Sequence, residues 1–297
     1  MNLDASVAAA GVRLLAFDTL GSTNTEALAR ARTGERGPLW ITAACQTAGR
    51  GRRGRSFVSE RGNLYATLLV TDASPVERAA ELAFVAALAA HDAVVEVATE
   101  LGPRLAVKWP NDLLCDGAKL AGILVEGESA SGQPLVTVVG IGINCAHHPA
   151  QTDHPATDLL AAGKCLSPEV LFTALSRAML ERLREWDRGR GFAATRAAWL
   201  ARAASIGMPV RVNSADRQLE GRFETLDPSG RLVLRLGDGT AEVITAGDVF
   251  PISQEQMPPS FWETTTSQKR PSGSHQAGDL TSAPSPPIEG KGRGTRA

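Results

Sequence analysis

Four arginines on a glycine-rich backbone are the residues of this chain best suited to bind an anion. The sequence at 48–55 is AGRGRRGR, and its cations are Arg50, Arg52, Arg53 and Arg55. Glycine gives the backbone many accessible conformations, and guanidinium groups form paired hydrogen bonds with phosphate or carboxylate oxygens. The stretch therefore predicts a flexible loop that can close around an anionic small molecule.

A second set of polar side chains lies within the sequence KWPNDLLCDGAKLAGILVE at 108–126. The Asp-Gly pair at 116–117 is typical of a hairpin turn, so we expect strands at 112–115 and 118–126. These strands would position Lys108, Asn111, Asp112 and Lys119. A lysine on such a rigid support can offset negative charge as it develops, which predicts chemistry on a phosphate-bearing substrate.

Two other interpretations of the arginine loop are weaker. Residues 49–54 match the dinucleotide-binding pattern G-x-G-x-x-G, which requires a helix directly after the third glycine. No helix-like segment follows Gly54, and arginines stand where small residues should let the backbone approach a pyrophosphate. The run of arginines is also short and interrupted by glycine, which disfavours a nucleic-acid or nuclear-localisation patch.

Composition and charge exclude further classes. The chain has 297 residues, enough for two domains and a sizeable core, and its formal charge of −1 argues against a surface built for nucleic acid. No apolar stretch is long enough to span a bilayer, and the first cation is Arg13, so we expect neither a membrane segment nor a signal peptide. The four cysteines lack CxxC spacing, which favours buried, reduced thiols in a cytoplasmic protein.

The sequence divides into three parts. Strand-like and helix-like segments alternate over residues 1–205, which predicts a mixed β-sheet with packed helices. Residues 206–252 contain short strand-like runs separated by turn residues, which predicts a small barrel or sandwich. Residues 253–297 are polar and proline-rich, so we expect them to be disordered. The predicted fold class is α+β.

The expected helices lie at 23–32, 75–98, 168–187 and 192–203. In the first part, the expected strands lie at 39–45, 64–70, 105–108, 112–115, 118–126 and 135–143. In the small domain they lie at 209–213, 218–226, 231–236 and 241–245. The first helix begins with Thr23-Asn24-Thr25-Glu26, which has the spacing of a capping box.

Five short motifs occur in the order in which biotin protein ligases carry them. They are GSTN at 21–24, QTAGRGRRGR at 46–55, KWPND at 108–112, KLAGILVE at 119–126 and GIGIN at 140–144. Each motif alone has low specificity, but five in this order are specific. The chain thus resembles the biotin protein ligases, or biotin–[acetyl-CoA-carboxylase] ligases, over most of 18–145. The segment 206–252 resembles their small, SH3-like C-terminal domain.

The resemblance implies an enzyme that uses ATP, biotin and Mg²⁺. Biotin would first be joined to ATP as biotinyl-5′-AMP, and a lysine of a biotin carboxyl carrier protein or domain would then attack the mixed anhydride. Lys119 would be catalytic, between the carboxylate and the phosphate, and Arg52 with it. A solvated strand lysine is the alternative for Lys119, but its place after a hairpin and before an apolar run favours a directed role.

The resemblance also implies residue roles. The residues implied for biotin are Ser22, Thr23, Asn24, Gln46, Arg50, Gly51, Arg52, Lys119 and Gly122. Those implied for ATP or the adenylate are Arg53, Arg55, Lys108, Trp109, Asn111 and Asn144. Asn111 and Asp112 are candidate Mg²⁺ ligands or hairpin caps, and Trp109 belongs either to the core or to the pocket. Closure of the arginine loop would protect the anhydride from water.

The subclass and the alternatives follow from the rest of the chain. The motif series begins near residue 17, so we expect a monofunctional ligase without an N-terminal DNA-binding domain. We therefore expect neither DNA nor a membrane as a partner, whereas a homodimer stays open. A lipoate or octanoate ligase or transferase is the alternative enzyme, although the arginine loop and the WPND segment are closer to the biotin pattern. A biotin-sensing repressor is the non-enzymatic alternative.

Overall fold

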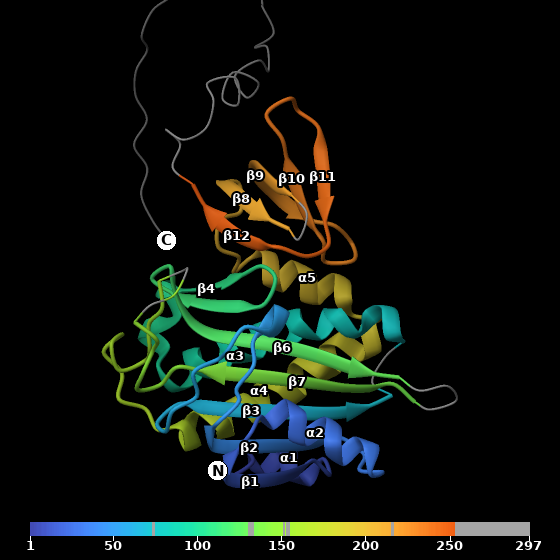
Figure 1. Cartoon of the computed structure of the whole chain (residues 1–297), viewed down its shortest axis with the longest axis vertical. Coiled ribbons are helices and arrows are strands. Elements are labelled where there is room, and N and C mark those ends of the chain that lie inside the picture. The colour runs from blue at the N-terminus through green and yellow to red at the C-terminus, as the bar shows by residue number, and fades with distance from the viewer. Residues whose placement is uncertain (73–74, 130–133, 151, 153–154, 215–216, 253–297) are drawn as a thin grey trace, which may run out of the picture.

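The computed structural model describes residues 1–72, 75–129, 134–150, 152, 155–214 and 217–252. The segment 253–297, for which we predict disorder, lies outside the described residues. The chain forms a large lobe around a seven-stranded sheet and a small lobe of five strands (Figure 1). This arrangement confirms the predicted α+β class, a mixed sheet with packed helices followed by a small β domain.

The sheet of the large lobe is mixed. Its strands, in spatial order, are β1 (Arg13–Leu20), β2 (Leu39–Gln46), β3 (Leu64–Thr71), β7 (Val136–Ile143), β6 (Ala118–Glu128), β5 (Asp112–Cys115) and β4 (Leu105–Lys108). Only β1 and β2 pair in parallel, because α2 (Thr23–Arg32) forms the crossover between them. All other neighbours are antiparallel, and the Asp116-Gly117 turn joins β5 to β6 as predicted.

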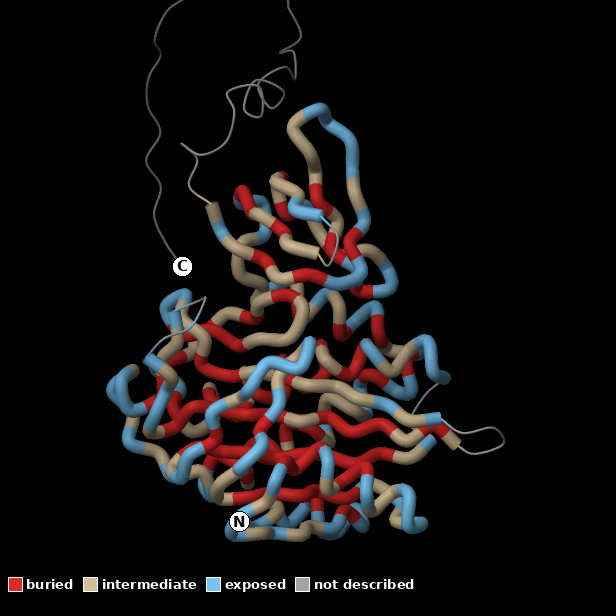
Figure 2. The backbone as a smooth tube through the Cα atoms, viewed as in Figure 1, coloured by how far each residue is buried: buried red, intermediate tan, exposed pale blue. Residues whose placement is uncertain are grey.

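Helices cover both faces of this sheet. Alternate residues of a strand point to opposite faces, and Trp40 and Leu68 pack into a different cluster from Leu39 and Leu69. The first cluster is covered by α3 (Leu82–Val97) and α4 (Pro168–Trp186), and the second by α2. Figure 2 shows buried backbone along the central strands. The remaining helices are α1 (Ala5–Ala9) and α5 (Phe192–Leu200).

Several predicted boundaries differ from the structure. The helix expected from residue 75 is a 3₁₀ segment at Val76–Glu81 followed by α3, because Glu81 turns inward to accept hydrogen bonds from Trp186 and Arg78. The last helix ends at Leu200 rather than 203. The sequence patterns predict neither α1 nor β1.

The small lobe is one antiparallel sheet. Its strands, in spatial order, are β11 (Ala241–Ile244), β10 (Leu232–Arg235), β9 (Gln218–Leu226), β8 (Pro209–Asn213) and β12 (Asp248–Pro251). Four of them match the predicted segments, whereas β12 was not assigned in advance. The return of the chain to pair β12 with β8 brings Asp248 next to the large lobe. Within the described residues, no helix has the length and apolar character needed to cross a membrane.

A buried indole joins the two lobes. The Trp109 side chain is 3% exposed, and its Nε1 donates to the buried carbonyl oxygen of Gly230 at 3.0 Å. Trp199 is a useful contrast, because its Nε1 is also buried but has no hydrogen-bond partner among the described residues.

We predict that Trp109→Phe lowers the free energy of unfolding by about 1 kcal/mol more than Trp199→Phe does, because only the first leaves a buried carbonyl without its donor. Both substitutions shrink a buried ring, so the difference between them reflects the hydrogen bond lost at Trp109 and the unpaired N–H removed at Trp199. Urea unfolding followed by circular dichroism measures it. Equal losses of stability in the two variants would contradict the prediction.

Candidate active site

A cavity of about 400 Å³ lies where the large lobe meets the small lobe. Its walls come from the start of α2, the loop after β2, strands β5 to β7 and the first residue of β12. Most of the predicted site residues line it: Ser22, Thr23, Asn24, Gln46, Arg50, Gly51, Arg52, Arg55, Asn111, Asp112, Lys119, Gly122 and Asn144. Segments far apart in the sequence thus converge on one cavity.

The start of α2 forms one wall. Ser22 is the N-cap, with extended backbone and a side chain that accepts from the Thr25 N–H. The predicted capping box, which begins at Thr23, is therefore displaced by one residue, because the N-cap is Ser22. Thr23 has other partners, since its N–H and hydroxyl lie 2.8 and 3.1 Å from Oε1 of Gln46. Nε2 of Gln46 donates to Ser59. Gln46 thus fixes the helix start against the end of β2.

Glycines form the floor. Gly122 of β6 and Gly142 of β7 are opposite each other in the sheet, and the ring of Phe57 lies over them. A Cβ at Gly142 would be 2.7 Å from Cε1 of Phe57, and one at Gly122 would be 3.2 Å from Nζ of Lys119. Real side chains do not tolerate the first of these distances. The floor is therefore bare backbone because it must admit an aromatic ring and a lysine.

Two lysines flank one carboxylate at the far end of the floor. Nζ of Lys119 lies 2.7 Å from Oδ1 of Asp112, and Lys119 is also held by its backbone N–H, which donates to Pro155. Lys108 is opposite Asp112 in the β4–β5 pair. Burial lowers the pKa of Lys108 below its ordinary 10.5, and the negative charge of Asp112 opposes this shift. Lys108 does not line the cavity itself.

The arginine loop forms part of the cavity wall. Arg50 donates to Glu126 of β6 at 2.9 Å, and Arg52 donates to Asn111 at 3.2 Å and to the Gly247 carbonyl at 3.5 Å. Partial burial lowers the pKa of Arg52 below its ordinary value. In this structure the arginine loop is attached to the rest of the protein, because Arg50 and Arg52 form hydrogen bonds with residues of the large and small lobes.

Asp248 of the small lobe neutralises the other two arginines. Arg55 donates to its Oδ2, and Arg53 lies 3.4 Å from the same oxygen. Burial alone would raise the pKa of Asp248. The hydrogen bond from Arg55 and the nearby guanidinium charges outweigh that effect, so its pKa lies below 3.8. Arg53 is outside the cavity lining and has left-handed backbone, with φ of 56°.

Two further predicted nucleotide residues have structural partners. Nδ2 of Asn144 donates to the Thr157 carbonyl, which ties the end of β7 to the loop beside it. Trp109 is absent from the cavity wall and contacts Gly230 instead. The structure therefore favours the core alternative for Trp109 over a place in the pocket.

Several residues of the site had no predicted role. They are Phe57 over the glycine floor, Thr67 and Glu126 beside Asn24, and Asp248 opposite the arginine loop. The only available signal was indirect. A cluster of arginines requires nearby carboxylates, and Glu126 ends one of the five motifs. Nothing in the local sequence indicates that residue 248 meets residue 55.

This arrangement suits the joining of two anions. Lysine and arginine side chains surround the polar end of the cavity, whereas the Phe57 ring and the strand backbone form a less polar part. A carboxylate and a phosphate repel each other in water, but fixed cations between them remove that repulsion. Nucleophilic attack of a carboxylate on phosphorus is a reaction that this geometry favours.

Comparison with known proteins agrees with the site. The biotin/lipoate A/B protein ligase family matches residues 17–144, and the biotin protein ligase C-terminal domain matches residues 205–250. The fold and site thus define a member of the biotin/lipoate ligase class.

Three similar proteins narrow this class. The chain is 41% identical to a biotin–[acetyl-CoA-carboxylase] ligase of Paracoccus denitrificans, over 77% of this chain and 96% of that protein. It is 36% identical to the ligase of the same name from Mycobacterium tuberculosis, over 77% of this chain and 85% of that protein. The solved Aquifex aeolicus biotin protein ligase in complex with biotin and ATP has 25% identity and a TM-score of 0.67, over 80% of this chain and 97% of that one. This chain belongs to the biotin protein ligases.

We predict that Asp248→Asn speeds hydrogen exchange across residues 49–57 in the free protein. The substitution removes the charge that Arg53 and Arg55 share, so the arginines repel one another and the loop opens more often. Asp116→Asn is the matched control, because Asp116 pairs with Arg104 on an exposed turn outside the cavity. Unchanged exchange in Asp248→Asn would show that Asp248 does not hold the loop.

Proposed function

We propose that this protein activates biotin with ATP and transfers it to a lysine of a biotin carboxyl carrier protein or domain. In the first step a carboxylate oxygen of biotin attacks the α-phosphorus of ATP, which forms biotinyl-5′-AMP and releases pyrophosphate. In the second step the carrier amine attacks the carbonyl carbon, which forms an amide and releases AMP and a proton. The observation that carries this proposal is the single cavity in which Lys119 and the arginine loop face the glycine floor.

Lys119 is the proposed catalytic cation. Its Nζ lies over Gly122 and beside Asp112, at the boundary between the aromatic part of the cavity and its polar end. A biotin carboxylate there would bring its charge next to Nζ, and the lysine would then shift from Asp112 towards the reacting oxygens. Charge stabilisation of this kind in a partly dry site is commonly the largest contribution to catalysis.

The proposed biotin subsite lies between Phe57 and the start of α2. Phe57 and the bare strands at Gly122 and Gly142 offer apolar contact, and Ser22, Thr23 and Gln46 offer hydroxyl and amide groups. A heterocycle with a short apolar chain needs this combination. Arg50 and Arg52 would lie over it when the loop is closed, and would exclude water from the anhydride.

The proposed phosphate subsite lies between the loop and the small lobe. Arg55 and Arg53 would exchange the carboxylate of Asp248 for phosphate oxygens, and Asn111 and Asn144 supply amides nearby. Asp112 and Asn111 offer oxygens for Mg²⁺, which would neutralise phosphate charge when bound. The described residues contain no group of three or more acidic, histidine or cysteine side chains, so its other ligands would be phosphate and water, as is common for Mg²⁺.

The proposed setting is the cytoplasm. All four cysteines are free thiols in the structure, as expected for a reducing compartment, but only Cys115 and Cys145 are buried as predicted, whereas Cys165 is exposed. The similarity to biotin ligases over nearly their whole length favours biotin over lipoate or octanoate as the acid. The names of those relatives point to acetyl-CoA carboxylase as the source of the carrier lysine.

Exchange of radioactive pyrophosphate into ATP tests the first step. We predict exchange that depends on biotin and on Mg²⁺, and only background exchange with lipoate, octanoate or no acid. The reason is that the arginine loop, together with Asn111 and Asp112 of the KWPND segment, lines one cavity with the glycine floor. Exchange with lipoate at a rate equal to that with biotin would reassign the acid.

We predict that Lys119→Ala keeps the fold and slows biotinyl-AMP formation roughly a hundredfold or more, the usual effect of losing one charge-stabilising group. Lys164→Ala is the control, since Lys164 pairs with Glu100 outside the cavity. Single-turnover kinetics with a thermal-melting check measure both variants. A folded Lys119→Ala protein with wild-type rates would return Lys119 to the role of a solvated strand lysine.

A further inference from the structure

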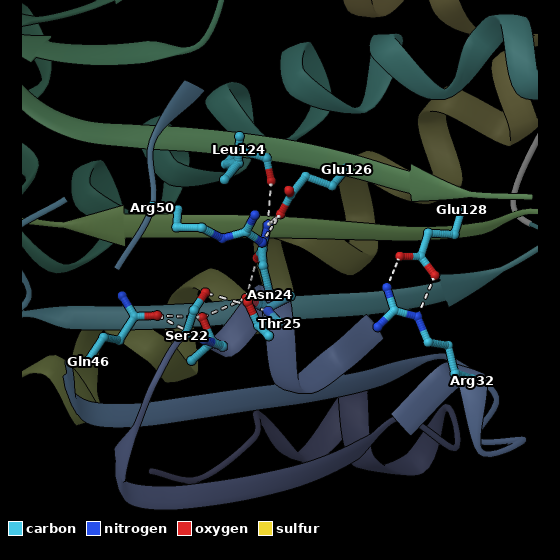
Figure 3. A network of polar contacts seen from close by, with 11 residues as sticks. Ser22, Asn24, Thr25, Arg32, Gln46, Arg50, Leu124, Glu126 and Glu128 are labelled. Atoms are coloured by element: carbon cyan, nitrogen blue, oxygen red, sulfur yellow. Dashed lines mark hydrogen bonds and ion pairs between the residues drawn. The ribbon is translucent and has the colours of Figure 1, made fainter. Parts of the chain in front are cut away.

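The side-chain amide of Asn24 makes all of its hydrogen bonds within the protein that its two N–H donors allow. Its Nδ2 donates to Glu126 Oε2 at 2.9 Å and to the Leu124 carbonyl at 3.2 Å, and its Oδ1 lies 2.7 Å from the Thr67 hydroxyl (Figure 3). Both Nδ2 partners are pure acceptors, so the orientation of the amide is fixed. Its two N–H donors are therefore both occupied, and Asn24 has none left for a ligand.

The backbone around Asn24 is shaped for this arrangement. Asn24 is 3% exposed and Thr67 is fully buried, so each needs its partners. Gly140 of β7 lies directly against the Asn24 amide, and a Cβ there would collide with Oδ1. Gly140 is therefore needed to make room for the Asn24 amide.

Glu126 carries the network from Asn24 to the arginine loop. The same Oε2 that accepts from Asn24 also accepts from Arg50 at 2.9 Å. The Glu126 side chain is 26% exposed and comes from the rigid sheet, whereas Arg50 lies on the glycine-rich loop. At its other end the network continues through Thr23 to Gln46.

We propose that Glu126 is a positioning residue that couples the start of α2 to closure of the arginine loop. A ligand that binds beside Ser22–Asn24 would stabilise this wall of the cavity, hold the carboxylate of Glu126 in place and so favour the closed position of Arg50. In the reverse direction, a loop that opens would loosen the same wall. The inference rests on the proposed function for the identity of the ligand, but not for the coupling itself.

The rival explanation is that Glu126 only forms a stabilising surface ion pair. The chain contains a matched case two residues further along β6, where Glu128 pairs with Arg32 at the end of α2 (Figure 3). That pair also joins α2 to β6, but it lies outside the cavity and contacts neither Asn24 nor the loop. Glu128→Gln is therefore a control of the same chemistry on the same strand.

The test compares wild type, Glu126→Gln, Glu128→Gln, Arg50→Gln and the Arg50→Gln/Glu126→Gln double variant. The measured quantities are the KM for biotin, kcat and the rate at which preformed biotinyl-AMP leaves the enzyme. Glutamine keeps an oxygen for Asn24 but removes the charge that binds Arg50. We expect Glu126→Gln to speed release about three- to tenfold, the size expected for a partly shielded charged hydrogen bond. We expect Glu128→Gln to stay within about twofold.

The double variant decides whether Glu126 acts through Arg50. We expect it to resemble Arg50→Gln alone, because the charge of Glu126 has no cationic partner on the loop once Arg50 is replaced. Additive effects, or a Glu126→Gln protein indistinguishable from Glu128→Gln, would overturn the proposal. Thermal melting of all variants separates these results from loss of fold.

Hydrogen exchange of residues 49–57, measured without ligand, tests the role of Glu126 whatever the substrate is. Glu126→Gln should speed this exchange, and Glu128→Gln should not. If wild type makes no biotinyl-AMP, the proposed function fails, but the exchange result still supports or refutes the role of Glu126. If wild type makes it and the exchange is unchanged in Glu126→Gln, the function stands and the positioning role fails.

Discussion

The balance of charge in a partly buried cavity is the constraint on which the site depends. Several cations converge there, and like charges in a medium less polar than water repel strongly. One carboxylate compensates each group of cations. Glu126 pairs with Arg50, Asp248 with Arg53 and Arg55, and Asp112 with Lys119. In the proposed function, an anionic substrate would bind by exchange with Asp112 and Asp248, whereas Glu126 would keep Arg50. A neutral molecule of the same shape gains nothing from this exchange, so charge compensation also provides selectivity.

The glycines of the site follow from the same constraint. Cations must approach the substrate closely, and the strands beneath must therefore carry no side chains. Gly122 and Gly142 leave room for Lys119 and Phe57, and Gly140 leaves room for the Asn24 amide. None of these three has positive φ, so they are needed for their small volume and not for backbone freedom. The loop glycine Gly54, with φ of 72°, illustrates the other use of glycine.

Much of this could be predicted from the sequence, because most site residues lie in short motifs on predictable elements. The β5–β6 hairpin follows from Asp116-Gly117, and its strands position Lys119 as expected. Residues whose role depends on a distant partner were not predictable. Asp248 meets Arg55 only because β12 returns to pair with β8, and Ser22 caps α2 because Gln46 occupies Thr23. Local patterns contain no information about such long-range contacts.

The small lobe contributes groups to the surroundings of the cavity. It contributes Asp248 and the Gly247 carbonyl to the arginine loop, while its Gly230 carbonyl accepts from Trp109 in the KWPND motif. Both sets of contacts reach segments that border the cavity, one the arginine loop and the other the KWPND segment. Any shift of the small lobe relative to the sheet must therefore change the partners of the loop arginines. The position of the small lobe and the partners of the loop arginines are consequently linked through ordinary ion pairs and hydrogen bonds.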